Sequence, residues 1–293
     1  MSRWGVRLMR LLAVLPLPVL RGLGRGVGLA LYALAGRRRR VGLINLRLCF
    51  PQATPAQHRA WLRAHFVAFS QAWLDRAWLW HAPAPVLAKR LHWCGQPEQL
   101  DEAVPTVVFA PHFVGLDAGW TALTQRVNRP LATIYTPQRD AVVDAWMLAG
   151  RGRFGDVRVC RREDGLQGIR SVLRQNGALY LLPDLNHGAQ ESVFVPFFGH
   201  DAATVPSLSR LARVGRARVV PMVCRLTADG YALEVLPAWG NFPTDDAWAD
   251  TARMNQELQA WVSERVTQYH WLHQRFKSRP DGGASPYEAG ASE

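Results

Sequence analysis

The chain has 293 residues, of which 48% are hydrophobic and 20% are charged, and its formal net charge is +12. This composition is typical of a globular chain with a sizeable core and does not fit a mainly disordered protein. The four cysteines are widely separated and form no C-x-x-C pair, so neither a zinc site nor a disulfide framework is supported. The positive charge suits a polyanionic partner, such as nucleic acid, anionic lipid or an acidic carrier protein.

Residues 1–40 combine two short apolar runs with arginines. The runs, residues 11–20 and 26–36, are each shorter than the roughly 20 residues that span a bilayer. Basic residues ahead of an apolar stretch also resemble a signal peptide. Arg21 and Arg25 interrupt that stretch, however, and four consecutive arginines follow it. We therefore predict a membrane-associating helical segment that lies in the interface, with its arginines directed toward anionic headgroups.

The remainder of the chain alternates between strand-like and helix-like segments. Apolar runs at residues 106–110, 131–135 and 178–183 are separated by segments with helical character. This alternation predicts an α/β fold in which a mostly parallel, twisted sheet is flanked by helices. We expect one domain over residues 41–280, and a disordered tail over residues 281–293, which are rich in small and polar residues.

A possible catalytic pair follows the first of these runs. His112 comes directly after the strand that ends at Pro111, and Asp117 follows in the spacing H-x4-D. The two side chains can meet only if His112 lies in the turn after the strand and Asp117 lies one turn inside the next helix. The carboxylate would then hold one imidazole nitrogen and leave the other as a general base. H-x4-D alone is weak, because it recurs by chance.

Three further stretches carry candidate functional residues. Arg151 and Arg153 lie in a glycine-rich connection, where they could bind a phosphate or a developing oxyanion. A loop that runs from Asp184 to Gly188 follows a buried strand, and its His187 is more typical of a turn residue than of a second base. The third stretch is the aromatic and basic segment YHWLHQRFKSRP at residues 269–280.

Taken together and in this order, these motifs resemble the late acyltransferases of lipid A biosynthesis, within the lysophospholipid acyltransferase superfamily. The resemblance rests on H-x4-D after a strand, GRGRFG, PDLNHG with SVFVPFFG, YHWLHQRFKSRP, and NLRLCFP at residues 45–51. It covers nearly the whole chain up to the tail.

The resemblance implies an enzyme on the cytoplasmic face of the inner membrane. It would transfer an acyl chain from acyl carrier protein to a hydroxyl of a phosphorylated glucosamine lipid, with no metal and no cofactor beyond that co-substrate. His112 would be the general base and Asp117 would orient it. The residues expected to bind substrate are Arg151, Arg153, Asp184 and Gly188.

Other functions stay open at this point. Leu185 and Thr136 depart from the family pattern where acceptor contacts could be made, so the acceptor could be another glycolipid, a phospholipid or a pigment-type lipid. The same dyad could also hydrolyse an acyl thioester. A nucleic-acid binder is not favoured, because the chain has no recognisable nucleic-acid module and its basic residues are spread along its length.

Overall fold

The computed structural model describes residues 3–161 and 165–288. Its centre is a seven-stranded sheet in the order β1-β9-β8-β2-β5-β3-β4. Neighbouring strands are parallel except β8 and β9, so the predicted α/β class with a mostly parallel sheet is confirmed. The strands are β1 (Leu91–Gly95), β2 (Thr106–Phe109), β3 (Leu131–Tyr135), β4 (Val157–Arg161), β5 (Ala178–Leu181), β8 (Arg218–Leu226) and β9 (Tyr231–Val235), and β6 (Val193–Phe197) and β7 (His200–Thr204) form a separate antiparallel hairpin.

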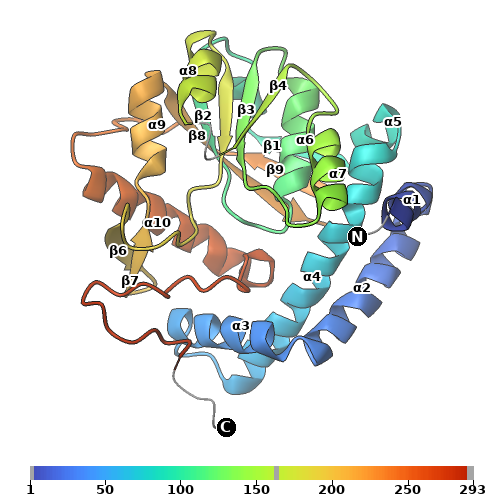
Figure 1. Cartoon of the computed structure of the whole chain (residues 1–293), viewed down its shortest axis with the longest axis horizontal. Helices are drawn as coiled ribbons and strands as arrows, with labels where there is room; N and C mark the ends of the chain where they lie inside the picture. Colours follow the sequence, from blue (N-terminus) through green and yellow to red (C-terminus); the bar gives the residue numbers. More distant parts are fainter. Residues whose placement is uncertain (1–2, 162–164, 289–293) are drawn as a thin grey trace.

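Helices cover both faces of the sheet (Figure 1). Along β2, Val107 belongs to one cluster of buried side chains and Val108 to the other, because successive residues of a strand point to opposite faces. Helices α8, α9 and α10 pack into the first cluster, and α6 and α7 into the second, whereas α4 contributes to both. The helices are α1 (Arg3–Leu12), α2 (Leu17–Leu34), α3 (Gly36–Cys49), α4 (Pro55–His81), α5 (Ala84–Ala88), α6 (Leu116–Arg126), α7 (Ala141–Arg151), α8 (Gln167–Arg174), α9 (Ser207–Gly215) and α10 (Ala247–Glu264), with short 3-10 turns η1 (Pro97–Leu100) and η3 (Val266–Gln268).

The N-terminal helices pack on α4, which connects them to the sheet domain (Figure 1). A capping box between Thr54 and Gln57 starts α4. Helix α2 lies so close to α4 that a Cβ at Gly28 would stand 2.6 Å from the Cα of Val67. Small residues on this side of α2 therefore allow the two helix backbones to approach each other.

Arg21 points into the protein, which differs from the prediction that the N-terminal arginines reach toward headgroups. Its Nη1 lies 3.1 Å from Oδ2 of Asp75, whose side chain is fully buried. Tyr231 donates to the same carboxylate at 2.7 Å. Burial raises the pKa of Asp75 even though Arg21 opposes that rise. Arg21 therefore attaches α2 to α4 and to the sheet.

Two elements of the structure lie across the predicted segment boundaries at residues 40 and 280. Helix α3 begins at Gly36, so the arginine block belongs to a helix that continues into the main body. At the other end, Ser285 and Tyr287 are buried, so this part of the segment predicted to be a disordered tail packs against the protein. Residues 289–293 lie outside the described part of the chain.

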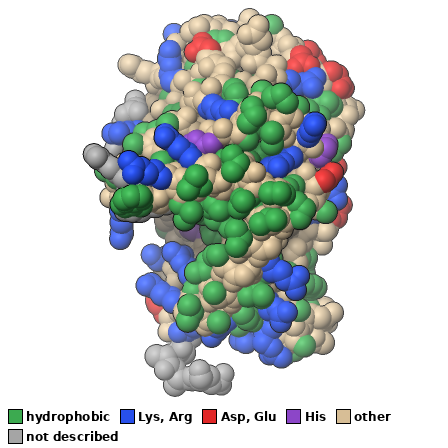
Figure 2. Space-filling view, turned by 90° about the vertical axis from the view of Figure 1, so that its right-hand side faces the viewer, with side chains coloured by type: hydrophobic (Ala, Val, Ile, Leu, Met, Phe, Trp, Pro, Cys, Tyr) green, Lys and Arg blue, Asp and Glu red, His purple; other side chains and the backbone are tan. Residues whose placement is uncertain are grey.

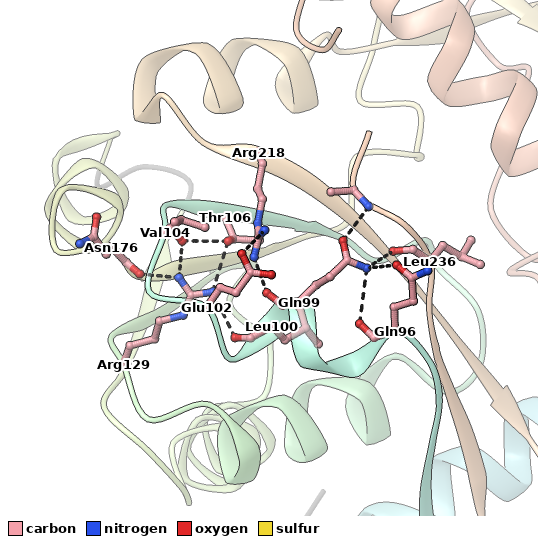
Figure 3. A network of polar contacts seen from close by, with 11 residues as sticks. Gln96, Gln99, Leu100, Glu102, Val104, Thr106, Arg129, Asn176, Arg218 and Leu236 are labelled. Atoms are coloured by element: carbon pink, nitrogen blue, oxygen red, sulfur yellow. Dashed lines mark hydrogen bonds and ion pairs between the residues drawn. The ribbon is translucent and has the colours of Figure 1, made fainter. Parts of the chain in front are cut away.

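A polar network ties together the amino ends of the central strands (Figure 3). Arg129 donates to the carbonyl oxygen of Leu100 at 3.3 Å and to Oγ1 of Thr106, the first residue of β2, at 3.2 Å. Arg218, the first residue of β8, pairs with Glu102 at 2.8 Å. These bonds stabilise the edge of the sheet that holds the amino ends of the strands. Open α/β sheets bind their ligands at the opposite edge, which holds the carboxyl ends.

Most of the large apolar side chains exposed in the described structure lie on α1, α2 and the turn between them. They form what we call the apolar face, which Figure 2 shows with Lys and Arg side chains around it. Within the described residues, no helix combines the length and hydrophobicity needed to cross a membrane. The apolar face consists of Trp4, Leu8, Leu11, Val14, Val19, Leu23, Val27, Leu31 and Leu34.

Candidate active site

A cavity of about 750 Å³ opens at the carboxyl ends of β2, β3 and β5. This volume is in the range of small-molecule sites. Polar and charged groups line part of its wall, among them His112, Asp117 and Arg151. Much of the remaining wall is apolar, with Phe69, Trp73, Ile134, Met147, Ile169 and Leu211 among its residues.

His112 and Asp184 face each other because their two strands are neighbours in register. Phe109 of β2 pairs with Leu181 of β5. His112 follows the first of these by three positions, and Asp184 follows the second by three. Nδ1 of His112 lies 2.7 Å from Oδ1 of Asp184. The backbone N–H of His112 also donates to both carboxylate oxygens, at 3.2 and 3.1 Å. Asp184 therefore fixes both the main chain and the ring of His112.

The protonation state of Asp184 determines which nitrogen of His112 can act as a base. Burial raises the pKa of the Asp184 carboxyl, but the charge of His112 and its hydrogen bonds outweigh burial, so the pKa lies below its usual value. An ionised carboxylate only accepts hydrogen bonds, so Nδ1 of His112 carries the proton that it donates. In the neutral ring Nε2 then has a free lone pair. The His112 side chain is 20% exposed, and it lines the cavity.

Asp117 contacts two arginines, not the imidazole ring with which it was predicted to pair. Arg76 of α4 donates from Nε to Oδ2 at 2.8 Å, and Arg151 of α7 donates from Nε to Oδ1 at 3.0 Å. Burial raises the pKa of Asp117, but the two guanidinium groups more than offset it and the net shift is downward. Asp117 does not form the predicted pair because two partly buried cations hold its two oxygens. All three side chains line the cavity, where they carry one net positive charge.

Of the two arginines predicted to bind substrate, only Arg151 lines the cavity. Arg153 donates from Nη1 to the carbonyl oxygen of Leu79 at 3.0 Å, and from Nη2 to that of Ala82. Carbonyl groups in the last turn of a helix lack intrahelical partners, and a cation is a favourable ligand for them. The structure therefore differs from the prediction at Arg153, which holds the end of α4.

The two residues of the loop after β5 that were predicted to bind substrate, Asp184 and Gly188, also differ in their surroundings. Asp184 meets His112, whereas Gly188 has a φ of 108° and serves the turn. Its N–H donates to Oδ1 of Asn186 at 2.8 Å. Gly188 is not among the residues that line the cavity, although its neighbour His187 is.

The segment at residues 269–280 closes the site from the C-terminal side. The N–H of His270 donates to the carbonyl oxygen of His112 at 3.0 Å. Tyr269 and Phe113 form an isolated antiparallel β-bridge. The His270 ring stacks on Phe69. Burial lowers its pKa well below the usual value, and the charge of His112 acts in the same direction. His270 is thus a neutral neighbour of the candidate base.

Arg76 and His270 were missed as site residues in the sequence. Each lies far along the chain from the residue that it contacts, and neither has a local motif that marks it. The partner of His112 did have a signal: the β2 and β5 runs are each followed by Pro and then by a titratable residue, as Pro111-His112 and Pro183-Asp184. Adjacent parallel strands bring such residues together at one edge.

The arrangement has the components of acyl transfer through a hydroxyl nucleophile. It supplies an oriented base, an excess of positive charge on the wall of the same cavity, and apolar surface around them. No group of three or more His, Cys, Asp or Glu side chains among the described residues is placed to hold a metal ion.

Comparison with known proteins gives a consistent result. The profile of the bacterial lipid A biosynthesis acyltransferase family matches residues 1–278. The chain is 30% identical to a lipid A biosynthesis lauroyltransferase of Escherichia coli K12, over 97% of this chain and 93% of the relative. It is 32% identical to a lipid A biosynthesis myristoyltransferase of the same organism, over 92% and 84%. A lipid A biosynthesis acyltransferase of Haemophilus influenzae is 30% identical, over 95% and 89%.

Proposed function

Because the chain belongs to the bacterial lipid A biosynthesis acyltransferase family, we propose that it transfers a fatty acyl chain from acyl carrier protein to a hydroxyl of a phosphorylated lipid A precursor. The observation that carries the proposal is the pair formed by His112 and Asp184 on the wall of a largely apolar cavity. The apolar part of that wall would hold the acyl chain. The pair would supply the chemistry at the thioester carbonyl.

In the proposed reaction, Nε2 of His112 takes the proton of the acceptor hydroxyl as its oxygen attacks the thioester carbonyl. Asp184 holds the ring in the productive tautomer and stabilises the imidazolium that forms, as an orienting carboxylate does. The tetrahedral intermediate then collapses, its C–S bond breaks, and the thiolate of the carrier takes the proton from His112. The products are an ester and a free thiol, so no cofactor is consumed.

Asp117 has a different role in this proposal. Its carboxylate holds the guanidinium groups of Arg76 and Arg151 at the cavity wall. The net positive charge that remains would stabilise a negatively charged group of the substrates. Asp117 is therefore a positioning residue that acts through the two arginines.

The membrane location is also part of the proposal. Two features support it: the apolar face of α1 and α2, and the arginines that surround it (Figure 2). A helix with apolar side chains on one side and basic ones around them lies in the plane of the membrane interface. We place this face on the cytoplasmic side of the inner membrane, where the arginine block would be retained. The net charge of +12 suits an acidic carrier protein as the acyl donor.

An assay of the purified full-length protein tests the proposed function. Labelled acyl carrier protein thioester is supplied with and without a lipid A precursor, and the lipid product is identified by mass spectrometry. We expect an acylated precursor and thiol release that depends on the acceptor. Equal thiol release without acceptor and no acylated lipid would show a hydrolase instead. His112→Ala protein is the control for background hydrolysis.

A further inference from the structure

A second cavity, of about 290 Å³, lies between α3 and the C-terminal segment. Three cationic residues line it: Arg37 and Arg40 from α3, and Lys277 from the C-terminal segment. Val41 and Ile44 contribute apolar surface, and Glu288 is the only acidic residue among the described residues that line it. None of these residues takes part in the active site. The cavity is thus a separate, predominantly basic pocket.

The walls of this pocket are held together by buried hydrogen bonds. Asn45 of α3 donates from Nδ2 to the carbonyl oxygens of Trp271 and His273, at 2.7 and 2.8 Å. The Tyr287 hydroxyl donates to Oδ1 of Asn45 and accepts from the N–H of Phe276. Because Asn45 and Tyr287 are both buried, these bonds fix the C-terminal segment against α3. The pocket is therefore built before any ligand arrives.

The start of α3 adds to the positive field. No acidic residue lies in its first turn, and no side chain caps its N-terminus. The N-terminal end of a helix already carries partial positive charge, and cations placed there weaken the helix. The charges of Arg37 and Arg40 at this end therefore add to the positive field of the pocket.

We propose that this pocket binds the phosphate group of an anionic phospholipid at the membrane surface. The apolar face leads directly to it: Leu31 and Leu34 at the end of α2 are 40% and 82% exposed, and α3 begins at Gly36. If the apolar face enters the membrane, the start of α3 lies at the depth of the headgroups. A concave pocket of this size fits a phosphate with a small headgroup, and its cationic lining matches the charge of that phosphate.

This inference rests on the membrane location proposed above, and vesicle binding tests the two separately. Full-length protein is mixed with vesicles of phosphatidylcholine alone, or with vesicles that also contain phosphatidylglycerol. The pocket variant is Arg37→Gln/Lys277→Gln, which changes two exposed side chains. The matched control, Arg47→Gln/Arg59→Gln, removes the same charge from exposed positions on α3 and α4 outside the pocket. A third variant, Leu23→Ser/Val27→Ser, alters the apolar face.

We expect phosphatidylglycerol to strengthen binding of the wild-type protein. The pocket variant should lose about tenfold or more of that gain, since each basic residue at an anionic surface contributes roughly fivefold. The matched control should lose much less, and binding to phosphatidylcholine alone should be equal in all three proteins. The apolar-face variant should weaken binding to both kinds of vesicle; if it does not, the proposed membrane location fails independently of the pocket.

Three results would overturn the proposal. If the pocket variant and the matched control lost equal parts of the gain from phosphatidylglycerol, binding would reflect a general attraction of the basic protein to the anionic surface. Normal vesicle binding by the pocket variant, with a raised KM for acyl carrier protein, would make this a carrier surface. Stabilisation by inorganic phosphate that the pocket variant lacks, with unchanged dependence on phosphatidylglycerol, would make it a site for free phosphate.

Discussion

Nδ1 of His112 and Oδ1 of Asp184 lie 2.7 Å apart although the two residues are separated by 72 positions in the chain. Two neighbouring parallel strands create this proximity, since both residues follow register partners at the same distance. The chemistry that we propose depends on this pair more than on any local motif. Asp117 lies only five residues from His112 in the chain, but its carboxylate accepts hydrogen bonds from Arg76 and Arg151 of the cavity wall.

Replacement of Arg151 should mainly affect turnover, whereas replacement of Arg153 should mainly affect stability. Arg151→Ala should lower turnover by roughly 10²-fold with little change in melting temperature, because it removes positive charge from the cavity wall. Arg153→Ala should lower the free energy of unfolding by about 1–3 kcal/mol, because it frees carbonyl groups at the end of α4. Steady-state kinetics and urea unfolding of both variants make the comparison. The same loss of turnover in the surviving Arg153→Ala protein would contradict this division.

Asp117 and His112 should act independently. Asp117→Asn should reduce turnover because an amide holds two guanidinium groups less firmly than a carboxylate. In the double variant His112→Ala/Asp117→Asn, the two losses should multiply, since one concerns proton transfer and the other the positioning of charge. The kcat values of the four proteins give the answer. A double variant no slower than His112→Ala would instead return Asp117 to the role of orienting His112.

The close approach of α2 to α4 should depend on Gly28 and not on Gly26. At Gly28 an added Cβ would lie 2.6 Å from the backbone of Val67, whereas at Gly26 it would meet nothing within 4 Å. Gly28→Ala should therefore lower the melting temperature. Gly26→Ala should leave it unchanged or raise it slightly, because alanine favours helix more than glycine does. Equal effects at the two positions would show that the helices do not pack as described.

Folding stability should increase as the pH rises from about 4 to about 6.5. Burial lowers the pKa of His65 from 6.5 to about 4. In this window the unfolded chain binds a proton at His65 that the folded protein does not, so stability is lost as the pH falls. Once the pH is below about 4, the protonation of His65 would have lowered the free energy of unfolding by about 3 kcal/mol. Urea unfolding across the window should show a smaller slope for His65→Leu than for the wild-type protein, and an unchanged slope would contradict this assignment.

Much of the fold could be predicted because its signals are local. The apolar runs at 106–110 and 178–183 become β2 and β5, and the alternation of strands and helices predicts the parallel sheet. The inward direction of Arg21 could not be foreseen in the same way. Its partner Asp75 lies on another helix, within a stripe of aromatic residues that gave no sign of a buried charge.

The active site shows the same limit. His112 and Arg151 were identified, and the structure brings both to the cavity. The pairing of His112 with Asp184 required knowledge of which strands are neighbours, and the sequence suggested a nearer carboxylate. Arg153 shares its motif with Arg151, but the two point in different directions because one contacts Asp117 and the other contacts the end of α4.

Turnover measured in a double-mutant cycle on His112 and Asp184 tests the central claim most directly. His112→Ala should cost roughly 10²–10⁴-fold in kcat, the usual contribution of a general base. Asp184→Asn should cost a large part of the same factor, because an amide cannot stabilise the imidazolium and favours the wrong tautomer. The double variant should be barely slower than His112→Ala, since an orienting group then has no ring to orient. Near-normal turnover of Asp184→Asn, or two losses that multiply in the double variant, would contradict the account.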